Sequence, residues 1–349
     1  MKHKNSKTTI WIMVIIIVAA GAFLAGQMLD FDFPWNKPTE SSRSEMSKPV
    51  SEASEIESSD ESQQETSESG ETSETSEEAS GTSQSSEISS EYVYVEKTDF
   101  DIKRGHLILV NRDLEYQFDD SDENTFVSVY QYKNKSYKVK NSTLSVKREV
   151  VEAMNDMFSD FKAKTGKNDI NIISGRRTYE NQETLYNKRV ASEGLEETNK
   201  YTALPGHSEH HTGYAVDLAI YTSDGLYYDF YGQDEYNWVN QNCYKYGFIE
   251  RYQEAKKEQT GFSAEPWHFR YVGVAHAKAM YDENMCHEEY MAMLKTHKFE
   301  GEHYFVTTGD GSEYEIYYVE GKNVPVPKDG EYEVSGDNDK GFVVTVKVK

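Results

Sequence analysis

The stretch PGHSEHHTGYAVDLAI, residues 205–220, places three histidines within five positions and one aspartate inside an apolar run. From Tyr214 onward, bulky and small residues alternate, which is typical of a β-strand with one buried face. The bulky side chains point to that face and the small ones to the other, as follows: Tyr214, Val216, Leu218 and Ile220 against Ala215, Asp217 and Ala219. The pattern predicts a strand that presents Asp217 on a face with free space beside it.

Asp217 needs solvent or a partner, because an unpaired buried carboxylate is too costly. A cation is one partner, and an arginine is another. His207, His210 and His211 lie ten, seven and six residues upstream, where any of them could supply an imidazole. Gly213 allows the chain to turn between these histidines and the strand.

A second segment, EPWHFRYVG at residues 265–273, offers two further groups. His268 begins an expected strand, and Glu265 precedes it across Pro266. Two histidines and one carboxylate would leave a fourth position for water, the usual layout of a catalytic zinc site, with Glu265 as general base. Other interpretations stay open at this point. Histidines on a loop are often solvated, Asp217 could pair with an arginine, and no HExxH helix links the groups.

Three blocks of the sequence resemble the VanY-type D-alanyl-D-alanine carboxypeptidase family of zinc peptidases. They are SGRRTYENQ at 174–182, SEHHTGYAVD at 208–217 and EPWHFRYVG at 265–273. The middle block matches the family pattern Ser-x-His-x-x-Gly-x-Ala-x-Asp at every fixed position, and the resemblance extends over about residues 105–295. It implies that His210, Asp217 and His268 bind Zn2+ and that Glu265 is the catalytic base.

The same resemblance implies a substrate site. Arg177 falls on the family's substrate-carboxylate arginine, with Gln182 and Ser208 on positions that line the substrate site. A planar guanidinium can hold a terminal carboxylate through two hydrogen bonds. His211 occupies a variable position and His207 lies outside the pattern, so we expect both to be neighbours that shape the pocket or its local charge.

Two positions depart from the family pattern. Arg176 stands where a tyrosine is common, and His207 stands where an aromatic residue is frequent. We expect these two side chains to add potential cations beside the cleft. They leave open which residue is released. The family resemblance alone does not indicate whether the penultimate residue is D or L.

The order of elements predicts an α+β fold, with a mainly antiparallel sheet and flanking helices around the zinc site. Strands are expected at 105–113, 125–132, 169–175 and after Pro266. Ser145 is expected to cap a helix that ends near Gly166, and Thr178 a helix that ends near Ser192. Further helices are expected at 235–246 and 288–295.

Alternating residues and Gly, Asp and Asn turns after about residue 299 predict a small β appendage. Residues 92–298 then form the zinc carboxypeptidase domain and residues 299–349 the appendage. Cys243 and Cys286 are the two cysteines, which is no disulfide framework.

Residues 1–37 are expected to form a cytoplasmic tip and a transmembrane anchor. Residues 8–29 carry no charge, and a helix of 22 residues spans about 33 Å, enough to cross a bilayer core. Lysines before the segment and aspartates after it predict export of the rest of the chain. A cleaved signal peptide is the alternative, because Ala20-Gly21-Ala22 resembles a cleavage site.

Residues 38–91 are rich in Ser, Glu and Thr, so we expect a disordered spacer. This segment holds 15 acidic and 2 basic residues, over half of the chain's net charge of −24. The acidity therefore says little about the remainder of the chain. We find no basic stripe that would bind nucleic acid.

The sequence thus predicts a membrane-anchored, extracellular zinc carboxypeptidase that removes the C-terminal D-alanine from peptidoglycan stem peptides, with DD or LD specificity open. One alternative is a peptidoglycan endopeptidase of the same fold. Another is a non-catalytic wall-binding module. The sequence does not indicate an oligomeric state.

Overall fold

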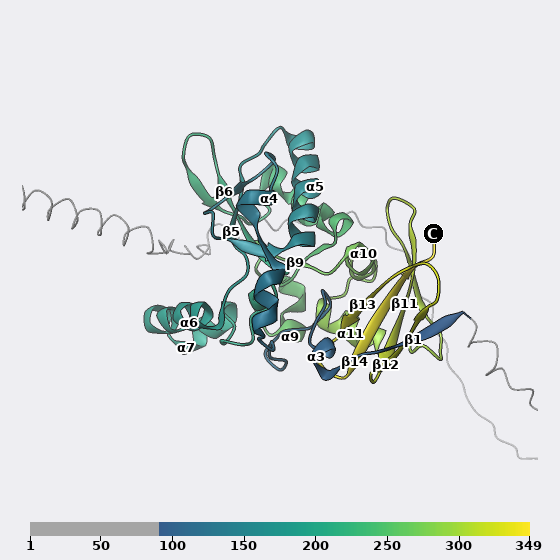
Figure 1. Cartoon of the computed structure of the whole chain (residues 1–349). Helices are drawn as coiled ribbons and strands as arrows, with labels where there is room; N and C mark the ends of the chain where they lie inside the picture. The colour runs from purple at the N-terminus through teal and green to yellow at the C-terminus, as the bar shows by residue number, and fades with distance from the viewer. Residues whose placement is uncertain (1–90) are drawn as a thin grey trace, which may run out of the picture. The chain divides into compact units, whose positions relative to one another are not determined.

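The central sheet of the computed structural model, which describes residues 91–349, brings distant segments of the chain together (Figure 1). Its order is β3 (Lys138–Val139), β5 (Ile170–Ser174), β6 (Ala215–Tyr221), β9 (His268–Tyr271) and β8 (Phe248–Glu250), with β7 (Tyr227–Asp229) also paired to β6. Only β3 and β5 run parallel; the other pairs are antiparallel. The expectation of a mixed fold of helices and sheets is confirmed.

Helix α5 (Arg148–Thr165) supplies much of the core that covers one face of this sheet. Its buried side chains repeat at helical spacing, and they pack in the same cluster as the bulky residues of β6. Gly166 ends the helix in the left-handed conformation, at φ 77°. Fully burying one such apolar side chain contributes about 1.5–3 kcal/mol.

Two helices follow β5. Thr178 caps α6 (Tyr179–Glu193), as predicted, by accepting a hydrogen bond from the backbone N–H of Asn181. Helix α7 (Leu195–Tyr201) packs beside α6, and Figure 1 shows the pair at the side of the molecule remote from the C-terminal strands. Nothing in the sequence pattern had indicated α7.

The C-terminal strands form a second sheet, in the order β10 (Tyr304–Thr307), β11 (Glu313–Glu320), β14 (Gly341–Lys347) and β13 (Glu331–Gly336). A separate pair joins β1 (Tyr92–Glu96) to β12 (Asn323–Pro327), and another joins β2 (Phe126–Ser128) to β4 (Ser145–Lys147). Helices α10 (Val274–Asp282) and α11 (His287–Leu294) pack against the four-stranded sheet, in a core shared with Leu107 and Ile249. Shorter helices are α3 (Asp99–Ile102), α4 (Val129–Tyr132), α8 (Asn237–Asn242) and α9 (Lys257–Thr260).

The strand expected at 105–113 is wrong. Residues Leu107 to Val110 are buried but pair with no strand. The guanidinium of Arg270 donates instead to the backbone carbonyls of His106 and Ile108, at 2.9 and 3.0 Å. A buried side chain thus satisfies the backbone groups that a neighbouring strand would otherwise satisfy.

Other boundaries also differ. The strand expected at 125–132 ends at Ser128 and continues as α4, and Ser145 lies in β4 rather than at the start of a helix. The helix expected at 235–246 is α8 flanked by two short 3-10 turns. Cys243 and Cys286 are both buried and free.

The expected anchor and nearly all of the expected linker lie outside the described residues. Within residues 91–349, the structure contains no helix with the length and apolar character needed to span a bilayer.

Candidate metal and substrate site

Three neighbouring strands of the central sheet place residues of the site side by side. In the register of the central sheet, Asp217 of β6 pairs with His268 of β9 on one side and with Ser174 of β5 on the other. A bulge between Ile172 and Ser174 shifts β5 at this point. Bulges of this kind often re-aim side chains next to functional sites.

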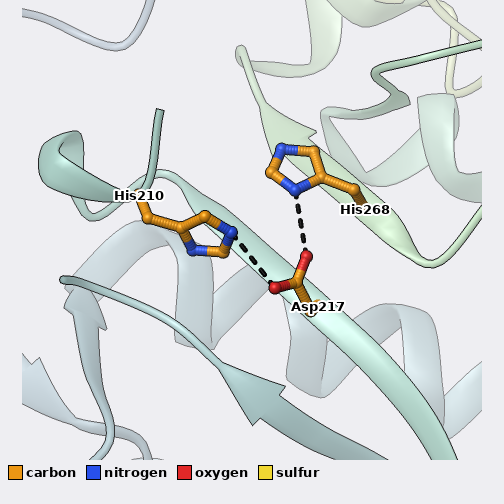
Figure 2. Close-up of side chains that lie close together, drawn as sticks. All are labelled: His210, Asp217 and His268. Atoms are coloured by element: carbon orange, nitrogen blue, oxygen red, sulfur yellow. Dashed lines mark hydrogen bonds and ion pairs between the residues drawn. The ribbon is translucent and has the colours of Figure 1, made fainter. Parts of the chain in front are cut away.

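Asp217 lies between two histidines, as Figure 2 shows. Its Oδ1 is 2.9 Å from Nδ1 of His268, and its Oδ2 is 3.2 Å from Nε2 of His210. All three residues are buried, and one ligand atom from each lies within 4.8 Å of the others. Among the described residues this is the one group with the geometry to hold a metal ion.

The backbone positions His210 so that Nε2 faces Asp217. His210 lies in the 3-10 turn η4 (Glu209–Thr212), which begins with Ser208 as its cap and ends at Gly213. Nδ1 lies 2.7 Å from the carbonyl of Gly175, an acceptor only, so Nδ1 carries a proton and donates it. Nε2 therefore has its lone pair available, and the two nitrogens and the carboxylate fit the donor set of a zinc site.

Glu265 is buried on the segment just before β9. Its backbone N–H donates to the carbonyl of Tyr252 at 2.8 Å, and its Oε2 lies 4.0 Å from Nδ1 of His268. Burial, with a contribution from Asp217, raises the pKa of Glu265 to about 8, although His268 opposes the rise. A metal ion nearby would lower this pKa, because a positive charge favours the carboxylate.

Arg177 reaches the same site from the turn between β5 and α6. One terminal nitrogen donates to Gln182 at 2.5 Å, and the other donates to Ser174 at 2.8 Å and lies 3.7 Å from Oδ2 of Asp217. Gln182 in turn donates to the carbonyl of Ala203 at 2.7 Å, so the amide is fixed and orients the guanidinium. A planar cation thus lies beside the three potential metal ligands.

Comparisons with known proteins agree with this arrangement. The family model of the VanY D-alanyl-D-alanine carboxypeptidases matches residues 143–274. A D-alanyl-D-alanine carboxypeptidase of Enterococcus faecium is 31% identical over 268 residues, which cover 75% of this chain and 79% of that protein. The chain belongs to the VanY family.

Two further relatives extend the comparison. The bifunctional D-Ala-D-Ala dipeptidase and carboxypeptidase VanXYC of Enterococcus gallinarum is 38% identical over 125 residues, 35% of this chain and 66% of that protein. The crystal structure of the D,D-dipeptidase VanXYg with a D-Ala-D-Ala phosphinate analogue superimposes with a TM-score of 0.64 at 32% identity, covering 73% of this chain and 98% of that one. The prediction of a carboxypeptidase of the VanY family is confirmed.

In this member of the VanY family, His211, at the variable position of the pattern, stabilises the turn between β5 and α6 that carries Arg177. The ring accepts a hydrogen bond from the backbone N–H of Gly206 at 3.1 Å and donates through Nδ1 to the carbonyl of Arg177 at 2.7 Å. The backbone N–H of Arg177 donates to the carbonyl of His210 at 3.1 Å. His211 thus helps to shape the site next to His210, although it occupies a variable position of the family pattern.

The two departures from the VanY pattern do not point to the potential metal ligands. Arg176 forms an ion pair with Glu123, and its guanidinium lies 4.9 Å from the centroid of the Phe126 ring. Nδ1 of His207 lies 2.8 Å from the carbonyl of Asn111. The charge of Arg176 is thus offset by Glu123, so that side chain does not act as a free cation of the cleft.

The predicted site residues come together to different degrees. One site contains all five residues of the predicted metal-binding, catalytic and carboxylate-binding groups: His210, Asp217, His268, Glu265 and Arg177. Gln182 contacts Arg177, whereas Ser208 is buried and its hydroxyl accepts from the N–H of His210 at 3.4 Å. The substrate contacts expected of Gln182 and Ser208 stay predictions.

Proposed function

We propose that this chain is a zinc-dependent carboxypeptidase that removes the C-terminal D-alanine from peptidoglycan stem peptides. The observation that carries the proposal is the guanidinium of Arg177, 3.7 Å from the carboxylate of Asp217. A cation that grips a terminal carboxylate so close to a hydrolytic centre favours cleavage of the last peptide bond. An enzyme that cuts within a chain has no need of this grip.

The residues divide the work as follows. His210, Asp217 and His268 would hold Zn2+, which would polarise the scissile carbonyl and lower the pKa of water to about 7. Arg177 binds the substrate carboxylate, and Ser174 and Gln182 keep its guanidinium in place. This positioning holds the bound substrate in the orientation that the reaction requires.

Glu265 handles the proton. Its carboxylate accepts a proton from the attacking water and passes it to the departing amine, a role that requires a group able to exist in both states near neutral pH. Burial provides this, because it raises the pKa of Glu265 to about 8 before any cation is bound. The charge of a bound metal ion would bring the value down toward the working pH.

A second candidate function is hydrolysis of the free dipeptide D-Ala-D-Ala. The similarity to VanXYC and to the VanXYg structure supports it, since both are described as acting on D-Ala-D-Ala as dipeptidases. Both functions would use the same arginine grip and the same water. They differ in how much room the site leaves on the amino side of the scissile bond.

The test is mass spectrometry of substrates incubated with the purified full chain, with zinc and with a chelator. The substrates are a stem pentapeptide ending in D-Ala-D-Ala, a stem tetrapeptide, the free dipeptide and intact muropeptides. Zinc-dependent loss of one D-alanine from the pentapeptide supports a DD-carboxypeptidase, and loss from the tetrapeptide supports LD specificity. Cleavage of the dipeptide alone favours the second candidate.

Two other outcomes would overturn the proposal. Internal cleavage of muropeptides, with both stem peptides intact, would favour an endopeptidase. No cleavage of any substrate by a zinc-loaded chain would favour a wall-binding module.

We further propose that residues 8–29 anchor the enzyme in the cell membrane, with the catalytic part outside. The uncharged run and the charges that flank it support this orientation. Release of the chain from spheroplasts by external protease, with the N-terminus retained in the membrane, is the expected result. A free, shortened chain in the medium would instead indicate a cleaved signal peptide.

A further inference from the structure

The residue just before His210 is a fully buried glutamate. Glu209 is 1% exposed and lies behind His268, away from Asp217. Its Oε1 is 2.8 Å from Nε of Arg251 and 3.3 Å from Nη1 of Arg270. Its Oε2 is 3.5 Å from Nε2 of His268.

His268 presents its two ring nitrogens to two different carboxylates. Nδ1 faces Asp217 at 2.9 Å, so Nδ1 is the nitrogen directed at the metal-binding position. A neutral imidazole carries a single proton, so a ring that ligates through Nδ1 carries its proton on Nε2. That N–H then requires an acceptor, because it is buried.

The carboxylate of Glu209 lies where an acceptor for this N–H is required. Within residues 91–349, neither Nε2 of His268 nor Oε2 of Glu209 has a hydrogen-bond partner, and the two atoms face each other at 3.5 Å. His210 already has an acceptor for the ring nitrogen that points away from Asp217, because its Nδ1 donates to the carbonyl of Gly175. A metal-binding histidine commonly donates its second N–H to a carboxylate or carbonyl, which fixes the ring.

We propose that Glu209 is a positioning residue for His268: its carboxylate accepts the Nε2 proton and so directs Nδ1 of the ring to the metal. The inference rests on the proposed zinc function. A role for Glu209 could not be predicted from the sequence, because the segments that surround its carboxylate are 42 to 78 residues away along the chain.

The competing explanation is that Glu209 only neutralises buried arginines. Without Glu209, Arg251 would lose one negatively charged partner. It would keep a second carboxylate, Glu288, which accepts hydrogen bonds from both terminal nitrogens at 2.9 and 2.6 Å. Glu209 and Glu288 thus bind the same guanidinium. Of the two carboxylates, only Glu209 also faces His268 and Arg270, so Glu288→Gln controls for the loss of a negative charge at Arg251.

The experiment compares Glu209→Gln with Glu288→Gln in the purified full chain. In Glu209→Gln the single amide oxygen is expected to turn to the arginines, which leaves an NH2 group facing Nε2 of His268. That group favours an unprotonated Nε2, and hence a proton on Nδ1 that competes with the metal. Two quantities are measured at one pH: the zinc dissociation constant by competition with a chelator, and the metal-free stability by denaturant unfolding.

We expect both variants to lose metal-free stability and only Glu209→Gln to lose zinc affinity, by about 10- to 100-fold. Equal zinc dissociation constants for the two variants would overturn the inference while leaving the proposed function intact. A wild-type chain that binds no zinc would overturn both.

A measurement on the wild type covers the case in which Glu209→Gln does not fold. In the zinc-loaded chain with 15N-labelled histidine, NMR is expected to show His268 with a slowly exchanging proton on Nε2 and none on Nδ1. A His268 protonated on Nδ1, or bare at Nε2, would show that Glu209 does not hold the ring as proposed.

Discussion

At the scale of single residues, the proposed mechanism assigns substrate binding and proton transfer to two different groups of the site. Arg177 and Glu265 come from segments 88 positions apart in the sequence, yet both border the same three potential ligands. Neither side chain contributes to the apolar core clusters. Replacing either side chain therefore removes no apolar contact within those clusters.

Arg177→Ala should lose activity only where the substrate carries a free terminal carboxylate. A hydrogen-bonded charge pair is worth about 1.5–3 kcal/mol, so kcat/KM on the stem pentapeptide should fall by about 10- to 100-fold. The C-terminally amidated peptide, which lacks the charge, should show little change. Steady-state kinetics on both peptides checks this, and equal losses would remove the carboxylate role.

Glu265→Ala should retain zinc and lose turnover. The side chain lies 4.0 Å from a ring nitrogen of His268 but is not itself in the ligand group, so the metal content should be unchanged. Loss of a general base typically costs about 10²- to 10⁴-fold in rate. Metal analysis and kcat on the same preparation provide the check. Turnover near the wild-type rate would move the base to another residue.

At the scale of elements, local sequence predicted those segments whose contacts are local. Three features depend on residues close by in the sequence, and each lies where it was expected. They are the alternation in residues 214–220, the N-cap at Thr178 and the helix end at Gly166. The strand expected at 105–113 failed because Arg270, 162 residues from Ile108, satisfies its carbonyls. The hydrogen-bond partners of His211 and Glu209 could not be predicted for the same reason, because they lie in distant segments of the chain.

The turn between β5 and α6 provides a test at this scale. His211→Ala would leave the carbonyl of Arg177 without its donor, so the guanidinium should be less well placed. We expect kcat/KM on the free-carboxylate peptide to fall by several-fold, roughly one buried hydrogen bond of about 1 kcal/mol, with zinc affinity unchanged. His207→Ala removes a histidine four positions away that contacts Asn111 instead, and it should leave both quantities near the wild type.

At the scale of the described part of the molecule, the C-terminal sheet and the central sheet meet through α10 and α11. His276 of α10 is one polar link between them: its ring contacts the hydroxyl of Tyr290 and the hydroxyl of Thr345 on β14, each at 2.8 Å. Residues of β8, α10, α11 and β14 share one apolar cluster around it. The two sheets should therefore unfold together rather than as independent units.

This link makes stability depend on pH. Burial, with the nearby rings of His106 and His287, holds the pKa of His276 well below its usual 6.5, and burial lowers that of His106 to about 4. Below pH 6.5 the unfolded chain binds protons at these positions while the folded chain does not. The contribution of these two histidines to the free energy of unfolding is therefore greatest above pH 6.5 and falls as the pH decreases, by up to about 1.4 kcal/mol per pH unit for each of them.

Denaturant unfolding of the metal-free full chain at pH 7.5, 6.5 and 5.5 measures this dependence. His276→Asn should lower stability at pH 7.5, because a shorter side chain cannot keep both hydroxyl contacts, and it should also flatten the decline toward pH 5.5, because one proton-binding group is gone. A decline as steep as that of the wild type would assign the pH dependence to other groups. One cooperative transition at every pH is expected from the shared core, whereas separate transitions would show that the C-terminal sheet folds on its own.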